Sequence, residues 1–198
     1  MISVRSAMRL LAAAALLLTA ACGTPPPPGG PAIATRDEVT ALASEIRSLG
    51  ANVDPAEAER AAEISFSYAR QLAFEYQVTD PPLVHNAKVN MGLRPRGLCW
   101  HWAEDMEARL KAENFRTLEL HRAIANSEST IRIDHSTAII SSRGDDMYAG
   151  VILDPWRYGG TLHWSKTLED DSYVWRPQQE VLAEKYPDHP AVLAFAGP

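Results

Sequence analysis

The stretch Gly97-Leu98-Cys99-Trp100-His101-Trp102-Ala103 decides the fold, because it places a cysteine at the expected start of a helix. Apolar residues follow at the spacing of one helical face, at Trp102, Ala103, Met106 and Leu110. In the first turn of a helix, free backbone N–H groups and the positive end of the helix dipole favour a thiolate, the nucleophilic form of cysteine. The alternative interpretation is that Cys99 is a small buried apolar side chain, as many cysteines are.

The elements predicted around this helix indicate an α+β fold, in which N-terminal helices and the cysteine-bearing helix pack on a small antiparallel sheet. Thr35-Arg36-Asp37-Glu38 has the pattern of a capping box, and the helix that it begins is expected to stop at Gly50. Asp54-Pro55-Ala56-Glu57 begins a second helix that runs to about Tyr76. Prolines and glycines interrupt residues 78–98, which are predicted to be mostly irregular chain.

Alternating and β-branched runs after the cysteine-bearing helix predict the strands of the sheet. We expect strands at residues 118–124, 135–141 and 149–153, a short strand at 162–164, and a final helix at 178–186. Gly144 fits the first central position of a two-residue type II′ turn, which would place Ala138 opposite Val151. In the same register His135 is opposite Asp154, with Cβ atoms about 5 Å apart. The alternative is that His135 is a polar edge residue and that Asp154 belongs only to a turn.

Three pieces of the sequence together resemble the transglutaminase-like cysteine enzymes, which are related in fold to papain-like proteases. They are Gly97-Leu98-Cys99 opening a helix, His135 beginning a strand 36 residues later, and Leu153-Asp154-Pro155-Trp156 closing the next strand. The resemblance covers about residues 60–160 and implies a transglutaminase-like core. It also implies that Cys99 is the nucleophile, His135 the general base and later acid, and Asp154 the group that orients His135. These residue types suit those roles on chemical grounds as well.

The sequence does not identify which groups would stabilise the oxyanion. Cys99 followed by Trp100 resembles the papain pattern, but the glutamine expected several residues earlier is missing, since position 93 is leucine. The backbone N–H of Cys99 could act together with Trp102, with His101 or with an asparagine of the preceding segment. The candidates for the substrate groove or the oxyanion site are Asn90, Trp100 and Trp102. Three later tryptophans could roof the groove or belong to the core, namely Trp156, Trp164 and Trp175.

The first 21 residues have the layout of a secretory signal peptide, with two arginines, an apolar run too short to be a confident membrane span, and small residues. Thr19-Ala20-Ala21-Cys22 resembles the lipobox of bacterial lipoproteins, although the family usually has leucine at position 19. The resemblance implies a mature chain that begins at a lipidated Cys22 and is anchored to a membrane. In a Gram-negative source this would be the outer membrane or a periplasmic face. Cleavage nearby without lipid would instead give a soluble secreted protein.

Lipidation of Cys22 would leave Cys99 as the single free thiol of an exported protein, because the chain has two cysteines. A free thiol in a compartment that oxidises thiols favours a reactive role. Residues 22–34 are predicted to be a lipidated, proline-rich tether, and residues 35–198 one domain. Removal of the signal peptide takes away two arginines and changes the formal charge from −6 to −8. This acidic balance argues against nucleic acid as a partner.

The sequence therefore predicts a membrane-anchored cysteine enzyme that hydrolyses or transfers acyl groups at peptide or amide bonds, without a cofactor. Its expected substrate is a peptide, a protein or a small amide of the cell envelope. One alternative is a non-catalytic binding or scaffold lipoprotein on the same fold. Another is an acetyltransferase with the same Cys-His-Asp order, which would need an acyl-CoA or similar donor. A metal site has little support, since the sequence has neither a C-x-x-C pair nor an H-E-x-x-H motif.

Overall fold

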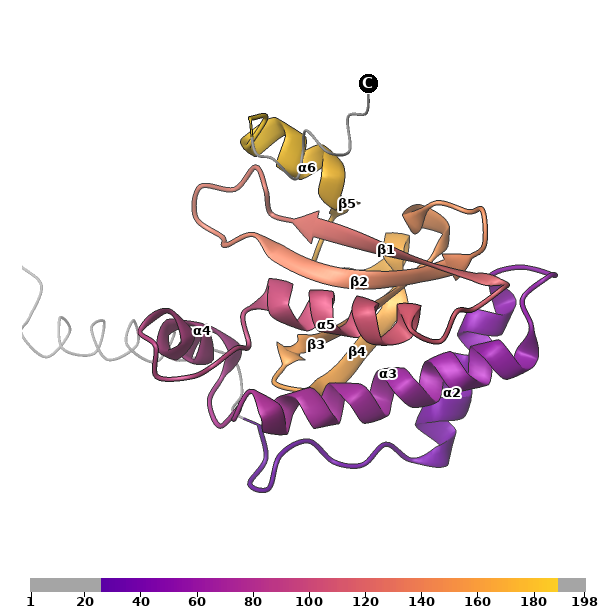
Figure 1. The fold of residues 1–198 in the computed structure, drawn as a ribbon, viewed down its shortest axis with the longest axis horizontal. Helices are drawn as coiled ribbons and strands as arrows, with labels where there is room; N and C mark the ends of the chain where they lie inside the picture. The colour runs from indigo at the N-terminus through magenta and orange to yellow at the C-terminus, as the bar shows by residue number, and fades with distance from the viewer. Residues whose placement is uncertain (1–25, 189–198) are drawn as a thin grey trace, which may run out of the picture.

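The computed structural model describes residues 26–188, which form five α-helices and one five-stranded antiparallel sheet (Figure 1). The helices are α2 (Arg36–Ser48), α3 (Pro55–Glu75), α4 (Pro82–Asn90), α5 (Cys99–Lys111) and α6 (Gln178–Lys185). The strands are β1 (Leu118–Ala125), β2 (His135–Ser142), β3 (Val151–Tyr158), β4 (Thr161–Lys166) and β5 (Trp175–Pro177), in the order β4-β3-β2-β1-β5. The predicted α+β class is confirmed.

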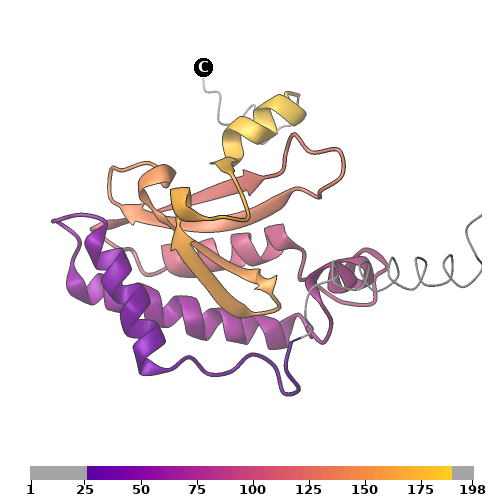
Figure 2. The same cartoon turned by 180° about the vertical axis from the view of Figure 1, so that it is seen from behind.

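The central helix α5 lies between α3 and the strands β1 and β2 (Figure 2). It packs on β1, β2 and β3, while α3 packs on α5 and on β4, and α2 packs on α3. The core between these layers is apolar and includes Leu42, Ile46, Met106, Leu110, Leu118, Ile140 and Leu153. Burial of these apolar side chains holds α5, and with it Cys99, against the sheet.

Both predicted N-terminal helix starts are confirmed. The Thr35 hydroxyl accepts a hydrogen bond from the Glu38 backbone N–H, and the Glu38 carboxylate accepts one from the Thr35 backbone N–H, which completes the capping box of α2. The Asp54 carboxylate accepts hydrogen bonds from the backbone N–H groups of Ala56 and Glu57 at the start of α3.

The prediction of mostly irregular chain over residues 78–98 is wrong at its centre, where α4 spans Pro82–Asn90. Proline breaks a helix in its interior, but in the first turn it has no intrahelical N–H partner to lose, so Pro82 can begin this helix. The helix is hard to find from periodicity, because its buried residues are only Pro82 and His85.

The predicted register between β2 and β3 is wrong by two residues. Ala138 lies opposite Leu153, not Val151, because the connection is longer than a two-residue turn. The turn closes with a hydrogen bond from the Asp145 N–H to the Ser142 carbonyl, and the 3-10 helix η1 (Met147–Ala149) then precedes β3. A shift of two residues keeps each side chain on its predicted face, whereas a shift of one would have reversed it.

The second face of the sheet carries a smaller apolar cluster, which includes Ala123, Ala125, Ile139, Met147, Ile152 and Trp175. The short strand β5, which the sequence did not predict, pairs with the end of β1 and brings Trp175 onto this face. The chain then continues into α6, which contacts β1 and β5.

The second half of the predicted tether lies against the domain. Residues 26–34 form neither helix nor strand, but Pro31 is buried, and its carbonyl accepts a hydrogen bond of 3.0 Å from Arg70 Nε on α3. None of the helices within residues 26–188 is long and apolar enough to cross a membrane. The predicted signal peptide and Cys22 lie outside the described residues.

Candidate active site

Cys99 is the first residue of α5, and the turn before it is tightly fixed. Gly97 has a φ of 123°, which glycine adopts more readily than any other residue. His85 of α4 packs directly against it, so that a Cβ at position 97 would lie 2.3 Å from His85 Nε2. From the other side, Trp102 Nε1 donates a hydrogen bond of 3.0 Å to the Gly97 carbonyl. These contacts hold the cysteine at a defined place in the helix start.

His101 stabilises the same turn by accepting backbone hydrogen bonds. Its Nδ1 lies 3.2 Å from both the Gly97 and the Leu98 nitrogen atoms, so it must be an unprotonated acceptor. Burial, and next the positive charge of Arg96, lower the pKa of His101 and favour this neutral form. The backbone N–H groups of Cys99 and Trp100 have no hydrogen-bond acceptor within residues 26–188. They remain available to a bound oxygen atom.

The Cys99 thiol is nearly buried, with 6% of the residue exposed. Its Sγ lies 3.5 Å from the carbonyl oxygen of Asp134, the residue that precedes His135. Residues 26–188 contain no disulfide, and Cys99 is a free cysteine. The helix start and the start of β2 thus meet at the thiol.

His135 binds Asp154, and the Cys99 thiol influences its pKa. Its Nε2 lies 2.7 Å from Asp154 Oδ2, and both residues are 1% exposed. Its Nδ1 is buried and has no hydrogen-bond partner among the described residues. Burial acts to lower the pKa of His135, but the Asp154 carboxylate and then the Cys99 thiol outweigh it and raise the pKa to about 9. Nδ1 is therefore the ring nitrogen that remains open to a further partner.

Asp154 is held as a carboxylate by a second set of contacts. Arg157 Nε donates to Asp154 Oδ2 at 3.0 Å, and the two terminal nitrogens of Arg157 bind the Asp170 carboxylate at 2.7 and 3.1 Å. Trp175 Nε1 donates to Asp170 at 2.9 Å. Burial acts to raise the pKa of Asp154, but His135 and Arg157 hold it below its usual range. The carboxylate therefore stays ionised and keeps its orientation toward His135.

Aromatic rings enclose the His135 imidazole on several sides. The ring centroids of Trp156 and Tyr173 each lie 4.6 Å from that of His135, and the centroid of Trp175 lies at 5.3 Å. Trp156 and Trp175, two of the three tryptophans considered as a roof, thus contact the histidine. Trp164 instead packs against the main core. The enclosure excludes water from the His135–Asp154 pair and strengthens its electrostatic interaction.

The residues expected to line a groove or an oxyanion site do not act as one group. Trp102 is 2% exposed and its N–H is bound to Gly97, so it is not free to bind an oxyanion. Trp100 is 45% exposed beside Cys99, and its carbonyl accepts from Arg122. Asn90 is exposed at the end of α4, and no hydrogen bond joins it to Cys99, His135 or Asp154.

The asparagine of α4 that does reach the site is Asn86, whose Oδ1 accepts a hydrogen bond of 3.0 Å from Trp156 Nε1. The sequence analysis allowed for an asparagine of this segment without singling out Asn86, and it did not predict Arg157 or Asp170. Arg157 follows Asp154 by three residues, and side chains at that spacing point to opposite faces of a regular strand. A register shift of β3 against β4 between Asp154 and Tyr158 changes that direction.

The arrangement suits nucleophilic rather than metal chemistry, because it combines a thiol at a helix start with a buried His–Asp pair. Residues 26–188 contain no group of three or more histidine, cysteine, aspartate or glutamate side chains placed to hold a metal ion. Comparisons with protein-family models, with curated proteins and with solved structures found no match to this chain.

Proposed function

We propose that this chain is a cysteine acyl-transfer enzyme that acts on peptide or amide bonds through Cys99, His135 and Asp154. The observation that carries the proposal is the His135 imidazole, which binds a buried carboxylate through Nε2, has no partner for Nδ1 within residues 26–188, and has its pKa raised in part by the Cys99 thiol. His85 Nδ1 is also buried without a partner among the described residues, so what distinguishes His135 is the combination of an open nitrogen with a carboxylate and the influence of a thiol. The free nitrogen is what proton transfer requires.

The proposed reaction begins from a thiolate–imidazolium pair, in which the Cys99 proton already lies on His135 Nδ1, as the raised pKa of His135 favours. The thiolate attacks the carbonyl carbon of the substrate, and the free N–H groups of Cys99 and Trp100 are placed to bind the developing oxyanion. His135 then gives its proton to the departing amine as the C–N bond breaks, which leaves a thioester on Cys99. Water or a second amine attacks the thioester, His135 takes the proton of the attacker, and Cys99 is regenerated.

The proposal includes two features that rest on the sequence pattern. The first is a transglutaminase-like core, supported by the order and context of Cys99, His135 and Asp154. The second is a lipid anchor at Cys22, supported by the apolar run and the small residues before it. Metabolic labelling with a fatty-acid analogue tests the anchor, because Cys22→Ser should lose the label while the wild-type chain carries it.

The test of the nucleophile uses an activated ester as the acyl probe and the mass of the intact protein as the readout. We expect one acyl group per molecule on the peptide that contains Cys99, and none in Cys99→Ser. Hydroxylamine should remove the group, because it cleaves a thioester. Acylation elsewhere, or equal acylation of both proteins, would contradict the proposal.

The 6% exposure of Cys99 favours one second candidate, a non-catalytic binding protein in which the cysteine is part of the core. This candidate predicts a thiol that reacts only after denaturant is added. It also predicts that Cys99→Ala changes the thermal stability without affecting any acyl transfer. The two candidates therefore differ in the native alkylation rate of Cys99, which iodoacetamide measures directly.

A further inference from the structure

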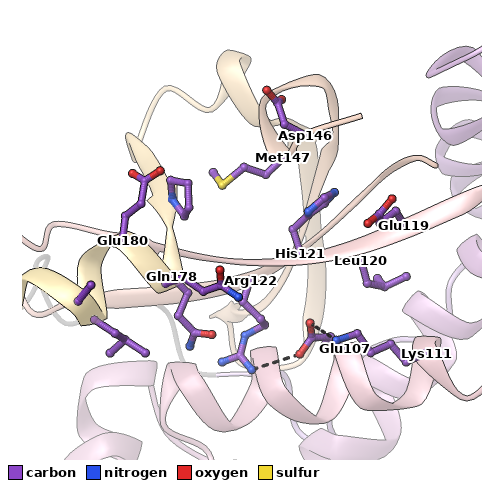
Figure 3. Close-up of a pocket in the computed structure, with 14 residues that line it drawn as sticks. Glu107, Lys111, Glu119, Leu120, His121, Arg122, Asp146, Met147, Gln178 and Glu180 are labelled. Carbon is purple, nitrogen blue, oxygen red and sulfur yellow. Dashed lines mark ion pairs between the residues drawn. The ribbon is translucent and has the colours of Figure 1, made fainter. Parts of the chain in front are cut away.

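A cleft of about 790 Å³ lies along the outer edge of β1 (Figure 3), and its lining includes neither His135 nor Asp154. Its walls come from β1, the second half of α5, α6 and the region of η1. The volume is in the range of pockets that bind organic ligands or short peptide segments. Figure 3 shows Arg122 reaching from β1 toward Glu107 of α5 across one end of this cleft.

The wall formed by β1 is a strand edge that no other described strand covers before Ala123, although the Leu118 carbonyl at its start accepts a hydrogen bond of 2.9 Å from Arg143 Nη2. β5 pairs only with Ala123–Ala125, and no strand within residues 26–188 pairs with the outer side of Leu118–Arg122. Alternate residues of such an edge direct their N–H and C=O groups outward at strand spacing. An extended peptide can satisfy these groups by adding a strand to the sheet.

The side chains of the cleft give it a negative charge. Both of its permanent cations face Glu107, with Lys111 at 2.8 Å and Arg122 at 3.7 Å. Three further carboxylates line the cleft, those of Glu119, Asp146 and Glu180, and none has an ion-pair partner within residues 26–188. Burial lowers the pKa of His121, so this side chain adds no positive charge at neutral pH. The unbalanced charge is therefore acidic.

We propose that this cleft binds an extended peptide segment that carries lysine or arginine, by adding a short strand to the outer edge of β1. The free strand edge accounts for the extended form, and the three carboxylates without cationic partners account for the basic side chains. The chain's own residues 189–198 contain neither lysine nor arginine, so they lack the matching charge. The inference does not depend on the chemistry of Cys99.

The experiment measures the fluorescence anisotropy of a labelled peptide of about eight residues that alternates lysine with threonine or valine, added to the full chain. We expect binding that weakens as salt is added, because the carboxylate–lysine attraction is screened. A peptide of the same length with glutamate in place of lysine should bind at least tenfold more weakly. Equal binding of the two peptides would overturn the assignment to a basic segment.

Two further measurements separate the contribution of charge to peptide binding from the contribution of strand pairing. Glu119→Gln and Glu180→Gln should each weaken binding of the basic peptide by about twofold to fivefold, whereas Glu59→Gln, an exposed change on α3 outside the cleft, should leave it unchanged. A peptide methylated on alternate backbone nitrogens should lose about tenfold in affinity, because it cannot donate to the strand edge. Unchanged affinity of the glutamine variants or of the methylated peptide would overturn the proposal. A chain that binds the peptide only after removal of residues 189–198 would show that its own tail fills the cleft, and would overturn it as well.

Discussion

Two buried histidines lie near Cys99, one in the same helix and one whose pKa the thiol influences, and their surroundings have opposite effects on the imidazole. His101, within α5, accepts two backbone hydrogen bonds through Nδ1, and burial and Arg96 lower its pKa. His135, at the start of β2, binds Asp154 through Nε2, and its pKa is raised to about 9. Burial alone disfavours the charged imidazole in both places.

The difference between His101 and His135 comes from the hydrogen-bond partner of each imidazole ring. Backbone N–H groups require an unprotonated acceptor and so fix His101 in its neutral form. A buried carboxylate requires a donor and favours the imidazolium form of His135. The Cys99 thiol is among the groups that raise the pKa of His135, whereas the Nδ1 of His101 is occupied by two backbone N–H groups. The comparison predicts which histidine controls the reactivity of Cys99.

The largest expected effect is on the alkylation of Cys99 by iodoacetamide near neutral pH. His135→Ala should slow the reaction by one to two orders of magnitude, because it removes the cationic partner of the thiolate. His101→Ala should change the rate by less than about threefold. The rates are measured by mass spectrometry on the native protein, with Cys99→Ser as the unreactive control. Equal slowing by the two histidine variants would break the comparison.

The neighbourhood of His135 and Asp154 was predictable even though the register behind it was not. The error of two residues preserved the face of the sheet, so Asp154 lies diagonally from His135, with Thr137 as its direct neighbour in the observed register. A hydrogen bond of 2.7 Å still forms, because diagonal side chains on one face remain within reach. The alternation of apolar residues predicts on which face of the sheet a side chain lies, whereas the register between two strands depends on the conformation of the loop that connects them.

Other parts of the site depend on tertiary structure that a local pattern does not encode. Arg157 reaches Asp154 only through the irregularity of β3, and Asp170 reaches Arg157 through the connection between β4 and β5. Asn86 enters the site because Pro82 begins a helix where the prolines suggested irregular chain. The capping signals of α2 and α3, by contrast, involve residues three apart and were readable directly.

The second prediction concerns stability between neutral and alkaline pH. The pKa of His135 is raised from 6.5 to about 9, so its contribution to folding is fully present below pH 6.5 and is lost as the pH rises through 9. A shift of this size corresponds to about 3 kcal/mol of unfolding free energy. Wild type should lose this amount between pH 6 and pH 10, as measured by urea unfolding, while His135→Gln should not. A parallel pH dependence of the two proteins would contradict the assignment of charge to His135.

The third prediction concerns His101, for which the sign is reversed. Its pKa is lowered, so the folded protein resists its protonation and loses stability as the pH falls below 6.5. His101→Ala should remove that acid sensitivity and also lower the unfolding free energy at pH 7 by about 2 kcal/mol, because the N–H groups of Gly97 and Leu98 lose their acceptor. His163→Ala is the matched control, since His163 is half-buried and accepts no backbone hydrogen bond within residues 26–188. A loss of stability in the control as large as in His101→Ala would leave the capping role unsupported.

The smallest expected effect separates the charge of Arg157 from its shape. Arg157→Lys keeps a positive charge near Asp154 but cannot bind Asp154 and Asp170 with one planar group. The unfolding free energy at pH 7 should fall by about 1 kcal/mol. The pKa of His135, followed by its NMR chemical shift, should fall by less than about one unit, because the carboxylate that raises it stays ionised. A return of that pKa to the ordinary value of 6.5 would show that the orientation of Asp154, rather than its charge, distinguishes His135 from His101.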